Sequence, residues 1–294
     1  MRVIWFCAAG HSFFVGIGLI IVATLLSAIS KKLYYKLTIY SLTIIGGLFI
    51  FLSATPLPLW FYIILATSVF VCFLFSVLSK SLGLKLSMLI PITALSLSIV
   101  ALLIELPYYL KPSFAKNKFE RLYIIGDSVS AGIGNKQEKT WPKILRTEYN
   151  VDIVNLSESG ATVATAIHQA AQITSENAIV LLEIGGNDLF VPKHYFQFEQ
   201  DLRQILEIIC NPKRTIVMLE LPLLPHQVKY GKIQRALAKQ FNVILIPKRF
   251  FVSVLSAKNT STDLAHLSPS GHEFMAKKIW SLIGSQLDSV TTKK

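Results

Sequence analysis

The sequence predicts an α/β protein in which an N-terminal transmembrane region of four helices precedes a domain with a parallel sheet of about five strands. Two observations indicate this. Four long apolar segments lie before Lys111, where only seven residues are charged. From Phe119 onward, short apolar runs alternate with amphipathic segments, which is typical of a parallel sheet covered by helices on both faces. We therefore divide the chain into a membrane region at 1–110, a linker at 111–118 and an α/β domain at 119–294.

The membrane region contains four apolar segments of about 20 residues or more, which is enough to cross a hydrocarbon core roughly 30 Å thick. They lie at about 3–29, 33–52, 57–78 and 86–106. The first is too long for the apolar part of a signal peptide, and three further segments follow it, so we expect a membrane anchor. The hydrophobic content of 52% agrees with a membrane protein.

The distribution of lysines predicts the orientation of these segments. The first and third connecting loops are basic and the second carries no charge; the lysines concerned are Lys31, Lys32, Lys36, Lys80 and Lys85. Basic loops stay on the cytoplasmic side, so we expect the N-terminus and the α/β domain on the extracytoplasmic side of the cytoplasmic membrane. The basic residues at 111–121 count against this orientation, although the rule is weak in a linker and a folded domain.

The charged residues also narrow the range of partners. The α/β domain keeps a net positive charge, which suits anionic membrane lipids or glycans. No basic run is interleaved with aromatic residues, so nucleic acid is not an expected partner, and nothing identifies a protein partner. His11 and Glu105 are ionisable groups beside or within the apolar segments. Such groups are candidates for function, although both are close enough to segment ends to lie in the membrane interface.

Within the α/β domain, five apolar runs predict strands and four amphipathic stretches predict helices. The strands are expected at 122–125, 151–156, 178–184, 215–221 and 242–246. The helices are expected at 161–176, 198–210 and 228–241, with a last helix that begins near Ser270. Asn211-Pro212 and Pro222 mark the ends of the second helix and the fourth strand.

The first strand ends abruptly in Gly126-Asp127-Ser128, and small residues follow it. This pattern predicts a tight turn from a buried strand into a helix. Ser128 would then lie at the carboxyl end of the strand, where open α/β sheets bind ligands. A structural turn with a capping serine is the alternative interpretation of the same residues.

Three further motifs follow the other strands. Gly160 comes after the second strand, Gly185-Gly186-Asn187-Asp188 after the third, and Asp263-Leu264-Ala265-His266 between the last strand and the last helix. Because the carboxyl ends of parallel strands meet at one edge of the sheet, we expect all four motifs to converge there.

These residues have the chemical properties that acyl transfer needs. A serine hydroxyl is a weak nucleophile until a neighbouring imidazole takes its proton, and His266 can be that base. Asp263, three residues earlier, can accept the other ring N–H and fix the tautomer. The oxyanion would be bound by the backbone N–H groups of Ser128 and Gly160 and by the side-chain amide of Asn187.

The set resembles the GDSL/SGNH hydrolase superfamily, which is named for Ser, Gly, Asn and His in four blocks. The blocks are matched by Ser128, Gly160, Asn187 and His266, with Val129 where many members have Leu; the third block also includes Gly185 and Asp188, and the fourth continues through Leu267, Pro269 and Gly271. The resemblance covers about 119–294. It implies a flavodoxin-like three-layer α/β/α domain that hydrolyses or transfers ester-linked acyl groups, with no metal and no cofactor.

Other residues are assigned supporting or competing roles. Asp127 is expected to anchor its own turn, and Asp188 to hold a loop. His272 is the rival base, but we expect it to be exposed at the start of the last helix. The three remaining histidines of the domain share no ligand spacing with Cys or acidic residues, so no metal site is expected; they are His168, His194 and His226.

Related motifs are incomplete or missing. Gly132-Ile133-Gly134 lacks the third glycine of a dinucleotide-binding fingerprint. Ser128 is not surrounded by the Gly-x-Ser-x-Gly pattern of the α/β-hydrolases.

Three functions remain open at this point. The first is a membrane-anchored serine esterase that removes O-acetyl or other short acyl groups from envelope glycans or glycolipids. The second is an O-acyltransferase that passes the acyl group from the serine to a glycan or lipid hydroxyl; four spans are more than a tether needs. The third is a membrane interaction protein with a vestigial hydrolase domain, against which the complete set of four motifs argues.

Overall fold

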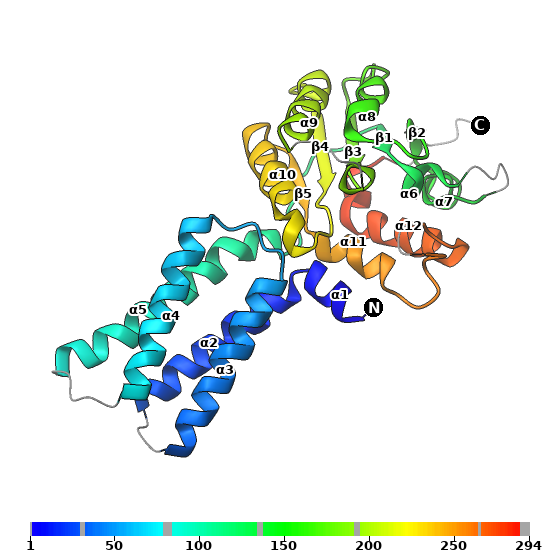
Figure 1. The fold of residues 1–294 in the computed structure, drawn as a ribbon. Coiled ribbons are helices and arrows are strands. Elements are labelled where there is room, and N and C mark those ends of the chain that lie inside the picture. Colours follow the sequence, from blue (N-terminus) through cyan, green and yellow to red (C-terminus); the bar gives the residue numbers. More distant parts are fainter. Residues whose placement is uncertain are drawn as a thin grey trace. The chain divides into compact units, whose positions relative to one another are not determined.

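The computed structural model describes residues 2–29, 33–78, 84–133, 138–190, 195–263 and 266–288. The chain separates into two compact units. A helical unit comprises Met1–Tyr109 with Leu223–Val228, and an α/β unit comprises Leu110–Pro222 with Lys229–Lys294. Figure 1 shows the all-helical architecture of the first unit and the central sheet of the second.

The helical unit is built from long apolar helices. They are α1 (Arg2–Ala8), α2 (His11–Ile29), α3 (Leu33–Leu52), α4 (Leu59–Leu78), α5 (Leu84–Glu105) and the short 3₁₀ helix η1 (Leu106–Tyr108). The backbones of α2 and α3 approach closely at Gly16 and Gly46, where a Cβ atom added to Gly46 would lie 2.8 Å from the carbonyl oxygen of Gly16. Small residues of this kind let apolar helices pack without a polar interface.

The number of membrane-spanning helices differs from the prediction of four. Within the described ranges, three helices are long and apolar enough to cross a bilayer: His11–Ile29, Tyr35–Leu52 and Leu89–Tyr108. The helix α4 itself runs over 20 residues, Leu59–Leu78, and the apolar part of it that the structure describes in full is Leu59–Leu74. The first predicted segment is also shorter, because Gly10 adopts a φ of +82° and separates α1 from α2.

His11 and Glu105, the two ionisable residues singled out in the membrane region, are both at least partly buried. Glu105 at the end of α5 is only 2% exposed. The Nδ1 atom of His11 lies 2.8 Å from the hydroxyl of Tyr109, and the two rings make an edge-to-face contact. That these groups lie in the membrane interface stays a prediction.

The α/β unit confirms the predicted five-stranded parallel sheet. Its strands are β1 (Arg121–Gly126), β2 (Asp152–Asn155), β3 (Ala178–Glu183), β4 (Arg214–Leu219) and β5 (Ile244–Ile246), and every neighbouring pair is parallel. The order β2-β1-β3-β4-β5 is the flavodoxin-like order. All six residues of β3 are buried, which explains why this strand is an almost continuous apolar run.

Helices cover both faces of this sheet (Figure 1). They are α6 (Ser128–Ala131), α7 (Trp141–Glu148), α8 (Val163–Ala170), α9 (Tyr195–Ile209), α10 (Val228–Gln240), α11 (Lys248–Leu255) and α12 (Pro269–Ile283), with the 3₁₀ helices η2 (Asn187–Leu189), η3 (Pro225–Gln227) and η4 (Gly284–Gln286). One layer contains α8 and α9, which pack together, and the other contains α7, α11 and α12.

Two helices of the second layer were not predicted, and one predicted helix is too long. The first turn of α7 contains Trp141-Pro142, and α11 directly follows Pro247, so both begin at residues that also signal loops. The predicted helix 161–176 forms only as Val163–Ala170.

The strand order places the functional edge of the sheet. The chain leaves β1 for β2 on one side and then crosses to β3 on the other side, so the carboxyl ends of β1 and β3 form the topological switch point. Ligands of open α/β sheets bind at such a point. Ser128 directly follows β1, and Asn187 follows β3, so the fold puts both residues at this edge.

Candidate active site

Ser128 is the first residue of α6, immediately after the turn that ends β1. The carboxylate of Asp127 caps this short helix, because its Oδ1 atom accepts the N–H of Val129 at 3.0 Å. The first N–H groups of a helix have no partner within the helix, and no hydrogen bond among the described residues uses the N–H of Ser128. Ser128 is 9% exposed, so its hydroxyl lies at the rim of the domain core.

The loop after β2 extends the sheet beside the nucleophile. The N–H of Leu156 donates to the carbonyl of Ile124, and the N–H of Glu158 donates to the carbonyl of Gly126. Gly160 follows with a φ of +78°, a conformation that favours glycine, and a Cβ atom there would meet nothing within 4 Å. The exposed backbone of Gly160 therefore faces open space near the end of β1.

Asn187 joins the first three motifs. Its Nδ2 atom donates to the carbonyl of Ala161 at 2.9 Å and to Oδ2 of Asp127 at 3.4 Å. One amide therefore contacts the loop after β2 and the turn before Ser128. Gly185, with a φ of +107°, and Gly186 allow this approach, since Gly186 lies against the Asp127 carboxylate.

Asp188 is fully buried beside Asn187 and holds a neighbouring helix. Its Oδ2 atom accepts the N–H of Val163 at 2.9 Å, at the start of α8. The hydroxyl of Tyr230 donates to the Asp188 carbonyl at 3.3 Å. These contacts fix the loop after β3 against α8 and α10.

Asp263 and His266 form a tight pair at the domain surface. The Nδ1 atom of His266 lies 2.7 Å from Oδ2 of Asp263, and the backbone N–H of His266 donates to Oδ1 at 2.7 Å. The carboxylate therefore orients the ring and leaves Nε2 as the atom that can accept a proton. The side chain of His266 is 35% exposed, and that of Asp263 is 56% exposed. Leu264 and Ala265 between them lie outside the described residues.

Residues of the other motifs lie near Asp127. This carboxylate contacts Asn187 and is near enough to His266 and Asp188 for their charges to affect its pKa. The described contacts do not include a hydrogen bond from the Ser128 hydroxyl to the His266 ring. In structures without substrate, catalytic hydrogen bonds are often long and shorten only in the complex, so this geometry keeps His266 as a candidate base.

Two acidic side chains under the nucleophile carry raised pKa values. Burial raises the pKa of Asp127 to about 6; the hydrogen bond from Val129 and the charge of His266 oppose this rise, and the charge of Asp188 adds to it. Burial raises the pKa of Glu183 well above its ordinary value, and the charge of Asp127 adds to that effect. Each carboxylate thus makes ionisation of the other costlier.

This arrangement predicts a pH-dependent stability effect of Asp127→Asn. Folding raises the pKa of the Asp127 carboxyl, so its contribution to the stability of the folded state is complete below the ordinary pKa of 3.8. That contribution is lost as the pH rises through about 6. The charge of Asp127 therefore costs up to about 3 kcal/mol at neutral pH. We expect the melting temperature of Asp127→Asn, relative to the wild type, to rise by several degrees between pH 4.5 and 7.5.

The control for this measurement is Asp152→Asn. Asp152 is half-exposed and pairs with Arg121 at 2.7 Å, so its replacement should bring no gain in melting temperature as the pH rises. A difference between Asp127→Asn and the wild type that does not change with pH would contradict the assignment of a destabilising buried charge at Asp127.

Two side chains that support the turn before Ser128 were not predicted from the sequence. Gln169, fully buried, accepts the N–H of Gly126 at 3.0 Å and donates to its carbonyl at 3.1 Å. Glu183 accepts the hydroxyl of Ser130 at 2.8 Å. The available signals were a glutamate inside the apolar run of β3 and a glutamine on the buried face of α8.

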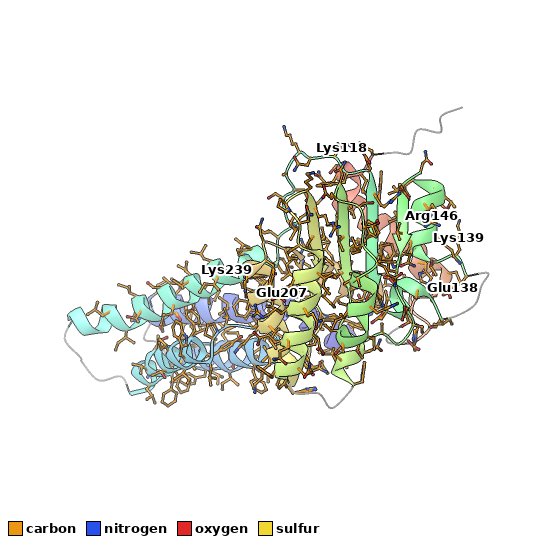
Figure 2. All side chains as sticks on the ribbon, turned by 90° about the horizontal axis from the view of Figure 1, so that it is seen from above. Lys118, Glu138, Lys139, Arg146, Glu207 and Lys239 are labelled. Atoms are coloured by element: carbon orange, nitrogen blue, oxygen red, sulfur yellow. The ribbon has the colours of Figure 1, made fainter. Side chains whose placement is uncertain are left out.

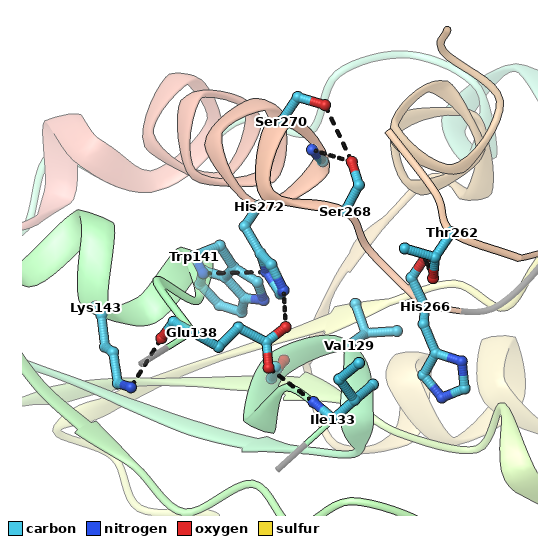
Figure 3. A network of polar contacts seen from close by, with 12 residues as sticks. Val129, Ile133, Glu138, Trp141, Lys143, Thr262, His266, Ser268, Ser270 and His272 are labelled. Carbon is cyan, nitrogen blue, oxygen red and sulfur yellow. Dashed lines mark hydrogen bonds and ion pairs between the residues drawn. The ribbon is translucent and has the colours of Figure 1, made fainter. Parts of the chain in front are cut away.

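The prediction that His272 is exposed is wrong. His272 is 1% exposed, and its Nε2 atom lies 3.0 Å from Oε1 of Glu138 (Figure 3). Figure 3 also shows His266 apart from this network. His272 faces inward because it lies on the same side of α12 as the buried Met275 and Ile279. It is occupied by Glu138, so it does not compete with His266 as the base.

Three further histidines were considered as metal ligands: His168, His194 and His226. His168 is exposed on α8 and contacts Gln172, and His194 lies outside the described residues. Over the parts of the chain that the structure describes, no group of three His, Cys, Asp or Glu side chains is placed to hold a metal ion.

Comparisons with known proteins match the same part of the chain. The model of the GDSL-like Lipase/Acylhydrolase family matches residues 124–274. Thioesterase 1/protease 1/lysophospholipase L1 of Escherichia coli strain K12 is 31% identical over 148 residues, which are 47% of this chain and 70% of that protein. An arylesterase of Vibrio mimicus is 28% identical over 195 residues, which are 60% of this chain and 94% of the relative.

A solved structure shares the fold. The psychrotrophic esterase EstA from Pseudoalteromonas sp. superimposes with a TM-score of 0.50 at 19% sequence identity. The superposition covers 56% of this chain and 97% of that structure. At this level of identity the similarity concerns the fold alone.

Proposed function

Because the chain belongs to the GDSL-like lipase/acylhydrolase family of ester hydrolases, we propose that it is a membrane-anchored serine esterase. Its substrates would be O-acetyl or other short acyl esters on envelope glycans or glycolipids. The observation that carries this proposal is the contact between Asn187 and Asp127 beside Ser128 at the switch point of the sheet, together with the Asp263–His266 pair, whose charge acts on Asp127.

The reaction would proceed through an acyl-serine. The Oγ atom of Ser128 attacks the carbonyl carbon of the ester while its proton passes to Nε2 of His266. The C–O bond to the alcohol then breaks, and His266 returns the proton to the leaving oxygen. Water next attacks the acyl-serine, gives a proton to His266, and releases the acid as that proton returns to Ser128. Asp263 keeps the imidazole in one tautomer throughout.

The developing oxyanion would be bound by three donors. The N–H groups of Ser128 and Gly160 are unused by other described residues, so both can donate without rearrangement. The Asn187 amide already makes two hydrogen bonds, and the one to Asp127 is the longer at 3.4 Å. We expect this weaker bond to yield to the oxyanion.

The surface position of the pair favours a large acceptor with a short acyl group. The side chains of His266 and Asp263 are 35% and 56% exposed, and Gly160 is also exposed. A polymer or a lipid headgroup can reach such residues without entering a deep tunnel. The names of the relatives, an arylesterase and a thioesterase/lysophospholipase, support acyl esters as the substrate class.

The test is serine labelling followed by hydrolysis. The full chain in detergent should react with a fluorophosphonate probe and hydrolyse p-nitrophenyl acetate, and Ser128→Ala should do neither. Wild-type protein that stays unlabelled while folded would favour the vestigial interaction protein. The native substrate would then be sought by mass spectrometry of envelope acyl groups in cells with and without the gene.

An O-acyltransferase is the second candidate. The helical unit buries its own core around Phe13, Ile17 and Phe61, which is more structure than a tether needs. Hydrolysis in H₂¹⁸O separates the two functions, because an esterase places one solvent oxygen in the released acid. Acyl groups that appear on an added glycan or lipid alcohol without ¹⁸O-labelled acid would establish the transferase instead.

The membrane location gives a further prediction. The apolar helices support an anchor in the cytoplasmic membrane, and the lysine pattern supports an extracytoplasmic α/β domain. Cys210 is exposed, whereas Cys7 and Cys72 are buried. We therefore expect an impermeant maleimide to label Cys210 in intact spheroplasts, and Cys210→Ser to abolish that label.

Burial raises the pKa of the Cys210 thiol, which slows its reaction with maleimide. A cysteine at a second position therefore serves as a control. Gln200→Cys, at an exposed position of α9, should restore labelling in the Cys210→Ser background. Labelling that occurs only after lysis would place the domain in the cytoplasm and overturn the proposed orientation.

A further inference from the structure

A buried histidine and a glutamate connect the two helices on either side of the candidate site. The Nδ1 atom of His272 accepts the backbone N–H of Trp141 at 3.3 Å, so in the neutral ring the proton is on Nε2. That N–H then donates to Oε1 of Glu138 at 3.0 Å. Burial lowers the pKa of His272, which favours this neutral form. The tautomer is therefore set by two fixed partners (Figure 3).

The second oxygen of Glu138 holds the end of the nucleophile helix. Its Oε2 atom accepts the backbone N–H of Ile133 at 2.9 Å, just beyond α6. A Cβ atom at Gly132 would lie 2.4 Å from the same oxygen, so the carboxylate packs directly against the backbone there. Gly132 also has a φ of +85°, which favours glycine. Through these contacts, Glu138 restrains the four-residue helix that begins with Ser128.

The other end of the connection reaches the loop of the candidate base. His272 is on the first turn of α12, which Ser268 caps by accepting the N–H of Gly271 at 3.1 Å. The N–H of Ser268 donates to the carbonyl of Thr260 at 3.0 Å, and Leu267 is buried. His266 directly precedes this fixed segment. Displacement of His272 would therefore move the backbone that carries His266.

Glu138 and His272 are not surface groups that meet by chance. The Glu138 side chain is 16% exposed and that of His272 is 2% exposed, although their positions are 134 residues apart. By contrast, Lys139 and Glu148 nearby form an ion pair with side chains that are 59% and 49% exposed. Figure 2 shows Glu138, Lys139 and Arg146 at the same side of the α/β unit. The buried pair and the exposed pair thus allow a matched comparison.

We infer that Glu138 and His272 form a positioning pair, which holds the Ser128 helix and the His266 loop at the separation that proton transfer between them requires. This inference rests on the proposed esterase function. Proton transfer needs heavy-atom distances of about 2.6–3.2 Å, and a displacement of about 1 Å can cost on the order of 10²-fold in rate. Neither residue touches the reacting atoms, so the pair acts on the rate only through Ser128 and His266.

Two substitutions of His272 separate its two hydrogen bonds, one with Glu138 and one with the backbone of Trp141. His272→Gln can still donate an N–H to Glu138, because its amide reaches about as far as Nε2. His272→Asn can still accept the N–H of Trp141, because its amide oxygen lies near the position of Nδ1, but it cannot reach Glu138. We expect His272→Gln to keep kcat within about threefold of the wild type, and His272→Asn to lose about 10- to 100-fold with little change in KM.

Glu138 provides an independent pair of variants. Glu138→Gln keeps the volume of the side chain and one acceptor oxygen, so it should fold and lose part of the rate. Glu138→Ala should lose about as much kcat as His272→Asn. Glu148→Gln, which removes only the exposed ion pair, should leave both constants unchanged.

All variants would be measured as full chains in detergent, well below their melting temperatures. The readouts are p-nitrophenyl acetate hydrolysis and the rate of fluorophosphonate labelling, which should fall together with kcat. If the wild type itself reacts with neither reagent, the proposed function fails. The pair is only structural if the wild type reacts and three folded variants react as fast as it does. These variants are Glu138→Gln, His272→Asn and Glu138→Ala. Equal losses in His272→Gln and His272→Asn would also overturn the inference.

Discussion

Replacement of His266 by alanine should lower kcat by about 10⁴ or more, because loss of a triad member removes the group that accepts the serine proton. The structure supports this expectation through the Asp263 carboxylate, which bonds both Nδ1 and the backbone N–H of His266 at 2.7 Å. The fold should tolerate the change, since the His266 side chain is partly exposed and its removal opens no core cavity.

Two variants test the specificity of this effect. Asp263→Asn should also lower kcat heavily, because an amide at this position can favour the wrong tautomer of His266 while the fold is kept. His168→Ala makes the same histidine substitution at an exposed position of α8 and should leave kcat unchanged. Activity of folded His266→Ala within about tenfold of the wild type would exclude His266 as the base.

The fold class could be predicted because its main signals are local. A strand buried on both faces is a continuous apolar run, and five such runs separated by amphipathic stretches allow few arrangements other than a parallel sheet. The helices α7 and α11 escaped prediction because Trp141-Pro142 and Pro247 are equally typical of loops. The start of the first membrane helix was predicted too early because hydropathy alone does not show where a helix breaks, as it does at Gly10.

The candidate site could be predicted only where chemistry has a short sequence signature. Ser128 and Asn187 stand in motifs that directly follow β1 and β3, so the topology places them at one edge, whereas α11 lies between β5 and the motif of His266. The contact between Glu138 and His272 has no such signature, because its partners are 134 positions apart and each is an ordinary polar residue in its local sequence. The misassignment of His272 as exposed followed from this, since burial depends on which face of α12 packs inward.

Asn187→Ala should lower kcat by about 10²–10³, the typical loss for one oxyanion donor, with a much smaller change in KM. A donor aimed at the oxyanion strengthens its bond only as negative charge develops, so its removal affects the transition state more than substrate binding. Part of the loss could instead come from loosening of the loops, because Asn187 also joins Ala161 to Asp127.

Asn155→Ala is the matched control for that second cause. Asn155 ends β2 at the same edge of the sheet, and its side chain also makes two hydrogen bonds, to the carbonyl of Ser130 and from the N–H of Ser157. Loss of these bonds should lower the melting temperature while kcat stays within a few-fold of the wild type. Comparable losses of kcat in Asn155→Ala and Asn187→Ala would mean that Asn187 supports loops only. A loss of less than about threefold in Asn187→Ala would remove it from the oxyanion hole, leaving the backbone N–H groups of Ser128 and Gly160 as the donors.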